Sequence, residues 1–393
     1  MTSTSFEIRP LTEQELPAAV EMNRVAFGGR RRPAEELPTP KPQPGAVDWG
    51  LFDGGRLVAK ANDREQQHWF GGRLVPASGF GGVAAAPEWR GGGVAGQLLS
   101  RVLAEARARG AAVNTLYRTV PGVYRRLGWE DAGVTAWSTY PTIAMDGLRI
   151  PAGMSVRPAT AADLPTIGAL YRQSAAEGNG LLERSAPWYC DTLDRNDGVT
   201  LAIGPDGAVE GYARWERGTG YSTGARLTVS ELLARTGPAV TALLANLASW
   251  GEALPTLAIC LAQGDPVSWA MPVDGTVTSL HPWMLRIIDA AAAVAARGWP
   301  AHLTGSVDLE IADEVCPWNA GPRRLIVEEG RARLEPGGSG SLQVSARGLA
   351  VLYAGSTQLA ALRRAGLIAG DSSADGFLDA ATAGPTPALL DAF

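Results

Sequence analysis

The sequence predicts a mixed α+β protein made of three consecutive domains, and three observations support this. The chain has 393 residues, a length that suits about three domains at the usual domain size. A motif near its start recurs further along. Beyond residue 281 the pattern of helices and strands changes. We therefore expect domains over residues 1–150, 151–280 and 281–393.

The first two domains are predicted to be copies of one another. The run Ile8–Thr12 reappears as Val156–Thr160, and the Leu-Pro pair that follows each run recurs at the same offset. Each copy is typical of a short strand, a threonine N-cap and an amphipathic helix. Glu15 and Asp163 stand where a capping box needs an acid. Duplication explains these matches better than the alternative, which is that a strand, a proline and a threonine commonly precede a helix.

The third domain is predicted to combine helices with short strands separated by Gly- or Pro-rich turns. We expect a first helix over Trp283–Arg297, ended by Gly298. Strands are expected at His302–Ile311, Arg324–Val327, Arg331–Leu334 and Ser341–Val344. Two helices are expected after them, at Gly348–Tyr353 and Thr357–Ala365.

Composition excludes several classes of protein. The net charge of −5 argues against a nucleic-acid binder, which needs a basic face. No apolar run approaches the roughly 18 residues of a membrane span, and the start resembles no signal peptide, so we expect a cytoplasmic protein without a membrane partner. Neither a metal site nor a disulfide framework is expected, because the cysteines and histidines are scattered: Cys190, Cys260, Cys316, His68, His281 and His302.

A strand, a glycine run and a helix form the most informative segment. The strand ends near Pro87, Arg90 opens the glycines Gly91–Gly93, and a helix is expected over Val94–Arg109. The start of a helix that has no capping side chain exposes backbone N–H groups, and glycines let this backbone come close to a ligand. Such a helix start is suited to binding phosphates. A P-loop is excluded because its lysine is missing, and a Rossmann fingerprint fits poorly at this place in the chain.

A second segment follows directly. Asn114–Tyr117 is expected to be a strand, and Pro121–Trp129 a short helix and turn that carries Tyr124. A neutral phenol can act as a proton donor. Tyr124 is either such a donor or a half-buried core aromatic, and the preceding glycine motif favours the donor. Tyr117 is a weaker candidate for the same role.

The two segments together resemble the GCN5-related N-acetyltransferases (GNAT). The match lies in the pattern Arg-x-x-Gly-x-Ala after a strand, followed by Tyr-x-x-x-Gly-Trp. The resemblance implies a bound co-substrate, acetyl-CoA, and a proton donor, Tyr124. It implies that the backbone of the splayed strand holds the pantetheine and the thioester oxygen, and that the glycine run holds the pyrophosphate: Val83, Ala84, Ala85, Arg90, Gly91, Gly92, Gly93, Val94 and Ala95. The counterpart in the second copy, after Leu227, lacks this loop, so we expect a degenerate domain there.

The whole chain resembles the enhanced intracellular survival (Eis) acetyltransferases, which follow two GNAT domains with a domain like a sterol carrier protein. Gly122–Trp129, Trp283–Gly298 and the tail from Leu378 carry this likeness. It implies a homo-oligomer, a hexamer in that family. It also implies that the carboxylate of Phe393 reaches the first active site and accepts the proton of the amine.

The sequence departs from that family where the acceptor binds. Ala392 replaces an acid, although Asp391 precedes it, and Gly82 replaces an aromatic residue. Arg30–Arg32 are either a solvated loop or an anion contact, and Pro33–Pro44 is either a lid or a surface loop. Candidate acceptor-binding residues are Phe27, Arg31, Gly82 and Asp391. We expect a small-molecule amine, but a preference for aminoglycosides does not transfer.

We interpret the protein as an enzyme that transfers acetyl to an amine by direct attack, because no cysteine lies in the first domain to form a covalent intermediate. Two alternatives stay open. One is acetylation of protein lysines, and the other is a non-catalytic protein that binds acyl-CoA or lipid.

Overall fold

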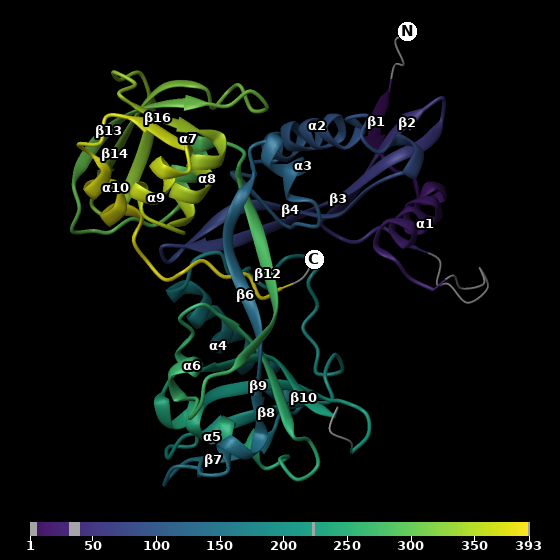
Figure 1. Ribbon diagram of the computed structural model, residues 1–393, viewed down its shortest axis with the longest axis vertical. Coiled ribbons are helices and arrows are strands. Elements are labelled where there is room, and N and C mark those ends of the chain that lie inside the picture. The colour runs from purple at the N-terminus through teal and green to yellow at the C-terminus, as the bar shows by residue number, and fades with distance from the viewer. Residues whose placement is uncertain (1–5, 31–39, 222–224, 392–393) are drawn as a thin grey trace.

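The computed structural model describes residues 6–30, 40–221 and 225–391. It confirms a mixed α/β fold with a twelve-stranded sheet and a separate five-stranded sheet. Figure 1 shows three lobes, with the first part of the chain and the last part side by side and the middle part below them.

The first half of the large sheet is formed by the N-terminal part of the chain. Helix α1 contacts the face of the sheet that carries Lys60, and α2 packs its apolar side on the opposite face, which carries Ala59 and Ala61. In order, the elements are β1 (Glu7–Pro10), α1 (Leu16–Phe27), β2 (Ala46–Asp53), β3 (Arg56–Phe70), β4 (Arg73–Ala85), α2 (Val94–Ala108), β5 (Val113–Tyr117), α3 (Pro121–Arg126) and β6 (Glu130–Pro141).

The second half repeats this beginning. Its elements are β7 (Ser155–Pro158), α4 (Leu164–Glu177), β8 (Gly198–Ile203), β9 (Val209–Arg217), β10 (Arg226–Ala234), α5 (Gly237–Ala248), β11 (Thr256–Ala262), α6 (Pro266–Ala270) and β12 (Thr276–Ile287).

The predicted capping boxes are present at both helix starts. The Glu15 carboxylate accepts hydrogen bonds from the backbone N–H of Thr12 at 2.8 Å and from its hydroxyl at 3.0 Å. Asp163 accepts the same two bonds from Thr160 at 2.8 and 2.9 Å. In each copy the arginine before the proline pairs with this carboxylate, at 2.8 Å in the first copy and 2.7 Å in the second. The two copies thus share a whole hydrogen-bond network in addition to a few identical residues, and this supports duplication.

One strand exchange joins the two halves into a single sheet. The strand order is β1-β2-β3-β4-β5-β12-β6-β11-β10-β9-β8-β7. Strand β12 lies between β5 and β6 and pairs antiparallel with both, and β6 also pairs with β11. Residue 281 therefore lies inside a strand of the large sheet. Figure 1 shows β6 and β12 running together from one lobe into the other.

The helix expected over Trp283–Arg297 is wrong in its first part. Trp283–Ile287 completes β12, and the helix is α7 (Ala290–Ala296) alone. An apolar run of this length suits a buried strand as well as a helix, and pairing with β5 and β6 decides between them.

The remaining elements form the third lobe, where helices pack on the five-stranded sheet. They are β13 (Gly305–Ala312), β14 (Gly321–Glu328), β15 (Arg331–Pro336), β16 (Leu342–Ser345), α8 (Ala346–Ala354), α9 (Leu359–Arg364), β17 (Ile368–Gly370) and α10 (Asp375–Thr382). The core of this lobe is continuous with apolar residues of the large sheet, such as Phe70 of β3 and Trp283 of β12. A buried ion pair between Arg286 and Asp313, 2.5 Å apart, spans the same junction.

Candidate active site

Strands β4 and β5 diverge at the centre of the first half. They pair in parallel only over Ala77–Gly79 and Val113–Thr115. Beyond this point β4 continues to Ala85 with β3 on its other side, where a bulge interrupts the register between Lys60 and Asn62. The backbone of Val83–Ala85 therefore has one edge that β5 does not cover. Such an edge can donate hydrogen bonds to a bound molecule.

The glycine run turns the chain directly into α2. Gly91 and Gly93 have φ of +80° and +77°, which a residue with a Cβ adopts only with strain. No side chain caps the helix, because Gly93 is its N-cap. The first-turn N–H groups and the positive end of the helix dipole are thus free to meet an anion. The nearby Glu88 is paired with Arg56.

A cavity of about 750 Å³ opens between these features. Its size is that of a typical small-molecule or cofactor site. Most of the residues expected to hold acetyl-CoA line it, together with Tyr124. The full lining is Ala26, Phe27, Val83, Ala84, Ala85, Trp89, Arg90, Gly91, Gly93, Val94, Ala95, Gly96, Thr119, Val120, Val123, Tyr124, Arg126 and Leu127. Gly92, also expected there, belongs to the same turn, and its N–H donates to the Trp89 carbonyl at 3.3 Å.

Tyr124 reaches the cavity wall from α3. It is only 5% exposed, and its ring meets that of Trp129 edge-on with centroids 6.1 Å apart. Burial raises the pKa of its hydroxyl, which an interaction with the Thr119 side chain partly offsets. The hydroxyl is therefore protonated at neutral pH. Tyr117, the weaker candidate, instead donates its hydroxyl hydrogen bond to the Leu389 carbonyl at 2.6 Å.

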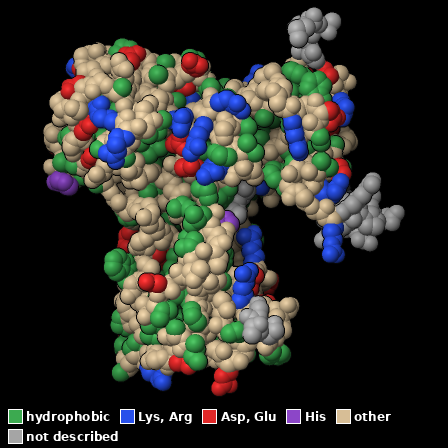
Figure 2. Space-filling model, in the orientation of Figure 1, with side chains coloured by type: hydrophobic (Ala, Val, Ile, Leu, Met, Phe, Trp, Pro, Cys, Tyr) green, Lys and Arg blue, Asp and Glu red, His purple; other side chains and the backbone are tan. Residues whose placement is uncertain are grey.

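The C-terminal tail is docked beside this site. From α10 it crosses to the junction of the first two lobes (Figure 1), and the notch at this junction is visible in Figure 2. Leu389 is fully buried, and the Ala388 N–H donates to the Asn179 carbonyl at 2.8 Å. The Asp391 carboxylate lies 3.0 Å from the Arg184 guanidinium and accepts from the Tyr171 hydroxyl at 3.1 Å. Asp391, expected near the acceptor, is thus engaged in anchoring the tail.

The other expected acceptor residues are spread over two cavities and beyond. Phe27 is 49% exposed at the rim of the large cavity. Gly82, with φ of +53°, faces a smaller neighbouring cavity. Arg31, Ala392 and Phe393 lie outside the described residues, and so does most of the expected Pro33–Pro44 loop.

Comparison with known proteins decides the family. Residues 7–132 and 180–287 each match a model described as an acetyltransferase (GNAT) domain, and residues 290–390 match a sterol carrier protein domain. An uncharacterized N-acetyltransferase from Streptomyces coelicolor is 30% identical over 319 residues, which cover 76% of each chain. The chain belongs to the GNAT family of N-acetyltransferases.

Solved structures agree over the full length. A GNAT from Kribbella flavida is 31% identical with a TM-score of 0.84, covering 99% of this chain and 98% of that one. A GNAT from Anabaena variabilis (24%, TM-score 0.89) and Eis1 from Mycobacterium abscessus (22%, TM-score 0.77) share the fold, each over 99% of this chain and all of theirs. The domain order expected from the Eis resemblance is confirmed, and the chain is an acetyltransferase.

The second GNAT domain differs from the first at the position of the cofactor loop. Only Arg235 and Thr236 separate β10 from α5. The Thr236 side chain caps that helix by accepting a hydrogen bond from the Ala239 N–H at 3.2 Å. One N–H of the first turn of α5 is therefore already satisfied by a side chain, which is not the case at α2.

Sequence reasoning missed the side chains of β3 that surround the smaller cavity. Lys60, Asn62 and Arg64 are every second residue of the strand, and they line this cavity together with Asn23 of α1. The alternation of polar residues was a usable signal, because a strand places every second residue on one face. It was easily overlooked, because the residues between them, such as Ala61, are buried too.

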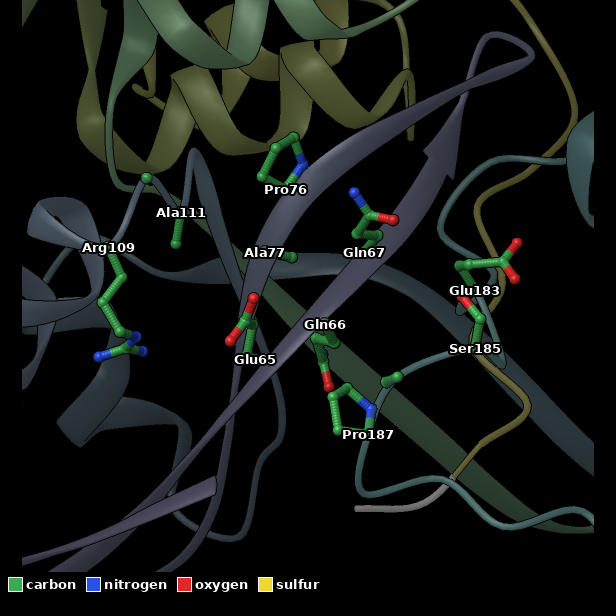
Figure 3. A pocket seen from close by; sticks show the side chains of 12 residues that line it. Glu65, Gln66, Gln67, Pro76, Ala77, Arg109, Ala111, Glu183, Ser185 and Pro187 are labelled. Atoms are coloured by element: carbon green, nitrogen blue, oxygen red, sulfur yellow. The ribbon is translucent and has the colours of Figure 1, made fainter. Parts of the chain in front are cut away.

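Another cavity, of about 260 Å³, lies where β3 meets the segment after α4 (Figure 3). Two of its three charged side chains, Arg109 and Glu183, are paired with Asp63 and Arg172, and the third is Glu65. Within the described ranges, no three His, Cys, Asp or Glu side chains are grouped to hold a metal ion, and no helix is long and apolar enough to cross a membrane.

Proposed function

We propose that this GNAT enzyme transfers the acetyl group of acetyl-CoA to a small-molecule amine by direct attack in a ternary complex. The observation that carries the proposal is the 750 Å³ cavity, where the uncapped start of α2, the free edge of β4 and Tyr124 meet. Among the described residues no cysteine lines this cavity, so a thioester intermediate on the enzyme has no nucleophile there.

The two ends of acetyl-CoA are assigned to different elements. Arg90 and the N–H groups of Gly91 and of Gly93–Ala95 would bind the pyrophosphate, since the positive end of a helix favours anions. The N–H groups of Val83–Ala85 would bind the pantetheine and the thioester oxygen. Donors fixed in the strand stabilise the oxyanion without having to reorganise.

The reaction then needs one proton donor and one proton acceptor. The amine nitrogen forms a bond to the thioester carbon, the C–S bond breaks, and the leaving thiolate takes the proton of Tyr124. The proton lost by the amine passes to the α-carboxylate of Phe393. A free terminus titrates near ~3.5, and desolvation at the docked tail would raise its pKa toward a useful value.

Release of the CoA thiol in the presence of an amine panel tests this function. The wild type should release thiol only when an acceptor is present. Tyr124→Phe should bind acetyl-CoA normally but turn over roughly 10²–10⁴-fold more slowly, as expected for the loss of a general acid. Tyr353→Phe is the matched control, because it removes a buried hydroxyl of the third lobe, where Tyr353 donates to the Ala293 carbonyl. Thiol release that Tyr124→Phe leaves unchanged would contradict the assignment.

A further inference from the structure

A polar cavity of about 220 Å³ adjoins the large one. Lys60, Asn62 and Arg64 line it from one face of β3, and its other polar lining residues are Asn23 of α1, Asp48 of β2, and Lys41 and Gln43 of the segment before β2. The two cavities are neighbours along the same elements, because Gly82 and Asn23 line the small one while Val83 and Ala26 line the large one. A molecule in the small cavity is thus adjacent to the point where β4 and β5 diverge.

Two polar atoms of this row have no partner among the described residues. The amide oxygen of Asn62, a residue only 7% exposed, accepts no hydrogen bond, and Nη1 of Arg64 is buried and donates none. A buried polar group without a partner destabilises a protein, and a ligand that completes its hydrogen bonding explains why such a group is kept. One atom is an acceptor and the other a donor, so a matching ligand needs both kinds of group.

The charges of the cavity are unequal. Lys60 is buried 3.7 Å from Asp48, so these two charges compensate each other. Arg64 makes no ion pair with the described residues; its guanidinium lies 5.6 Å from the centroid of the Trp188 ring. Burial lowers the pKa of Arg64, and the charge of the Asp48 carboxylate partly offsets this effect. Lys41 adds another positive charge at the rim. The cavity therefore favours an anion and opposes a polycation.

The strand register gives the ligand a direction. Asn62 pairs with Gly81, next to the diverging part of β4, whereas Arg64 pairs with Gly79, one step further from it. Alternate residues of a strand are roughly 7 Å apart. A ligand that bridges the two side chains would thus have its hydrogen-bond donor toward the thioester and its anion away from it.

We propose that this cavity binds the acceptor, and that the acceptor is a small amine that also carries an anionic oxygen group of the carboxylate class. Arg64 binds the anionic group, and the Asn62 amide oxygen accepts a hydrogen bond from the amine and orients it toward the acetyl group. Gly82 leaves the passage open, since a Cβ there would lie 3.1 Å from the Lys60 ammonium and 3.2 Å from the Asn23 amide. The inference rests on the proposed acetyl transfer and specifies its substrate class.

The test compares pairs of acceptors. Amino carboxylates of increasing chain length are each assayed against their own carboxamide, with a polyamine as a third acceptor, and kcat/KM is obtained from release of the CoA thiol. One charge-assisted hydrogen bond should favour the carboxylate by roughly 10- to 100-fold over its amide. Arg64→Gln should reduce this ratio to near one mainly through KM, and Arg64→Lys should restore part of it.

Arg333→Gln is the matched control, because it removes an exposed arginine of β15 in the third lobe and should keep the full ratio. Melting temperatures verify that each variant is folded. If the wild type had an equal or higher kcat/KM for the carboxamide or the polyamine than for the amino carboxylate, the proposed substrate class would be wrong. The proposed acetyl transfer would still stand. Absence of thiol release with every amine would contradict the proposed function itself. In that case calorimetry of an amino carboxylate with the CoA-loaded protein still decides the inference, and no binding would overturn it.

Discussion

At the scale of single residues, burial fixes the protonation state of groups that the sequence leaves undefined. His68 is fully buried in β3, and its Nδ1 lies 2.8 Å from the Gly180 carbonyl of the second half. A carbonyl only accepts, so the proton is on Nδ1. Nε2 is then the acceptor, facing two donors, the Gln66 amide nitrogen at 2.8 Å and the Thr115 hydroxyl at 3.0 Å. His68 is therefore a neutral link between the two halves, and Tyr124 is likewise a neutral phenol in the cavity wall.

This burial predicts a dependence of stability on pH. Desolvation lowers the pKa of His68 to about 4, whereas in the unfolded chain it is near ~6.5. Between these values the unfolded state binds more protons, so the free energy of unfolding should fall as the pH is lowered from ~6.5 to ~4, by at most about 3 kcal/mol. Denaturant unfolding at several pH values measures this slope.

Carboxylates also titrate in this pH range and change the free energy of unfolding. Variants of single histidines are therefore needed to isolate the contribution of His68. His68→Gln should flatten the profile over this pH range, and His281→Gln, at an exposed histidine, should leave it unchanged. Identical slopes in the wild type and in His68→Gln would show that His68 carries no such penalty.

At the scale of elements, the sequence predicted those features that residues adjacent in the chain determine, such as the starts of helices. The start of α2 at Val94 and the short helix around Tyr124 were recognisable because a glycine run or a proline precedes each of them. The strand at Trp283–Ile287 was mistaken for part of a helix because its partners lie more than a hundred residues earlier. The link between Asp391 and Arg184 is equally remote, and nothing in the local sequence of the tail specifies it.

The docked tail leads to a prediction about the chain end. Arg184 and Tyr171 hold Asp391 two residues before the terminus, so a short Gly-Ser extension after Phe393 should leave the tail docked while converting the terminal carboxylate into an amide. We expect unchanged acetyl-CoA binding and a similar melting temperature, but loss of most turnover.

The same extension placed before Met1 is the control and should leave turnover unchanged. If the C-terminally extended protein stays fully active, the α-carboxylate of Phe393 is not the base of the reaction.

At the scale of the whole molecule, we propose that the first GNAT domain carries the active site and that the second supports it. The strand exchange through β12 makes the second domain an integral part of the sheet that carries the first, and the third domain supplies the tail that crosses the junction. The two halves differ chemically at the start of the helix after the central strand. It is open at Gly93 in α2 but capped by Thr236 in α5. The central claim is therefore that each chain binds one acetyl-CoA, at the start of α2.

Titration calorimetry with acetyl-CoA on the full chain tests this claim most directly, in the wild type and in two matched variants. Gly92→Asp places a negative side chain in the loop, and Gly237→Asp makes the same change at the start of α5, where a Cβ has no atom within 4 Å. The account predicts one acetyl-CoA per chain in the wild type and in Gly237→Asp, and a collapse of affinity in Gly92→Asp. Two molecules bound per chain, or unchanged affinity in Gly92→Asp, would contradict it.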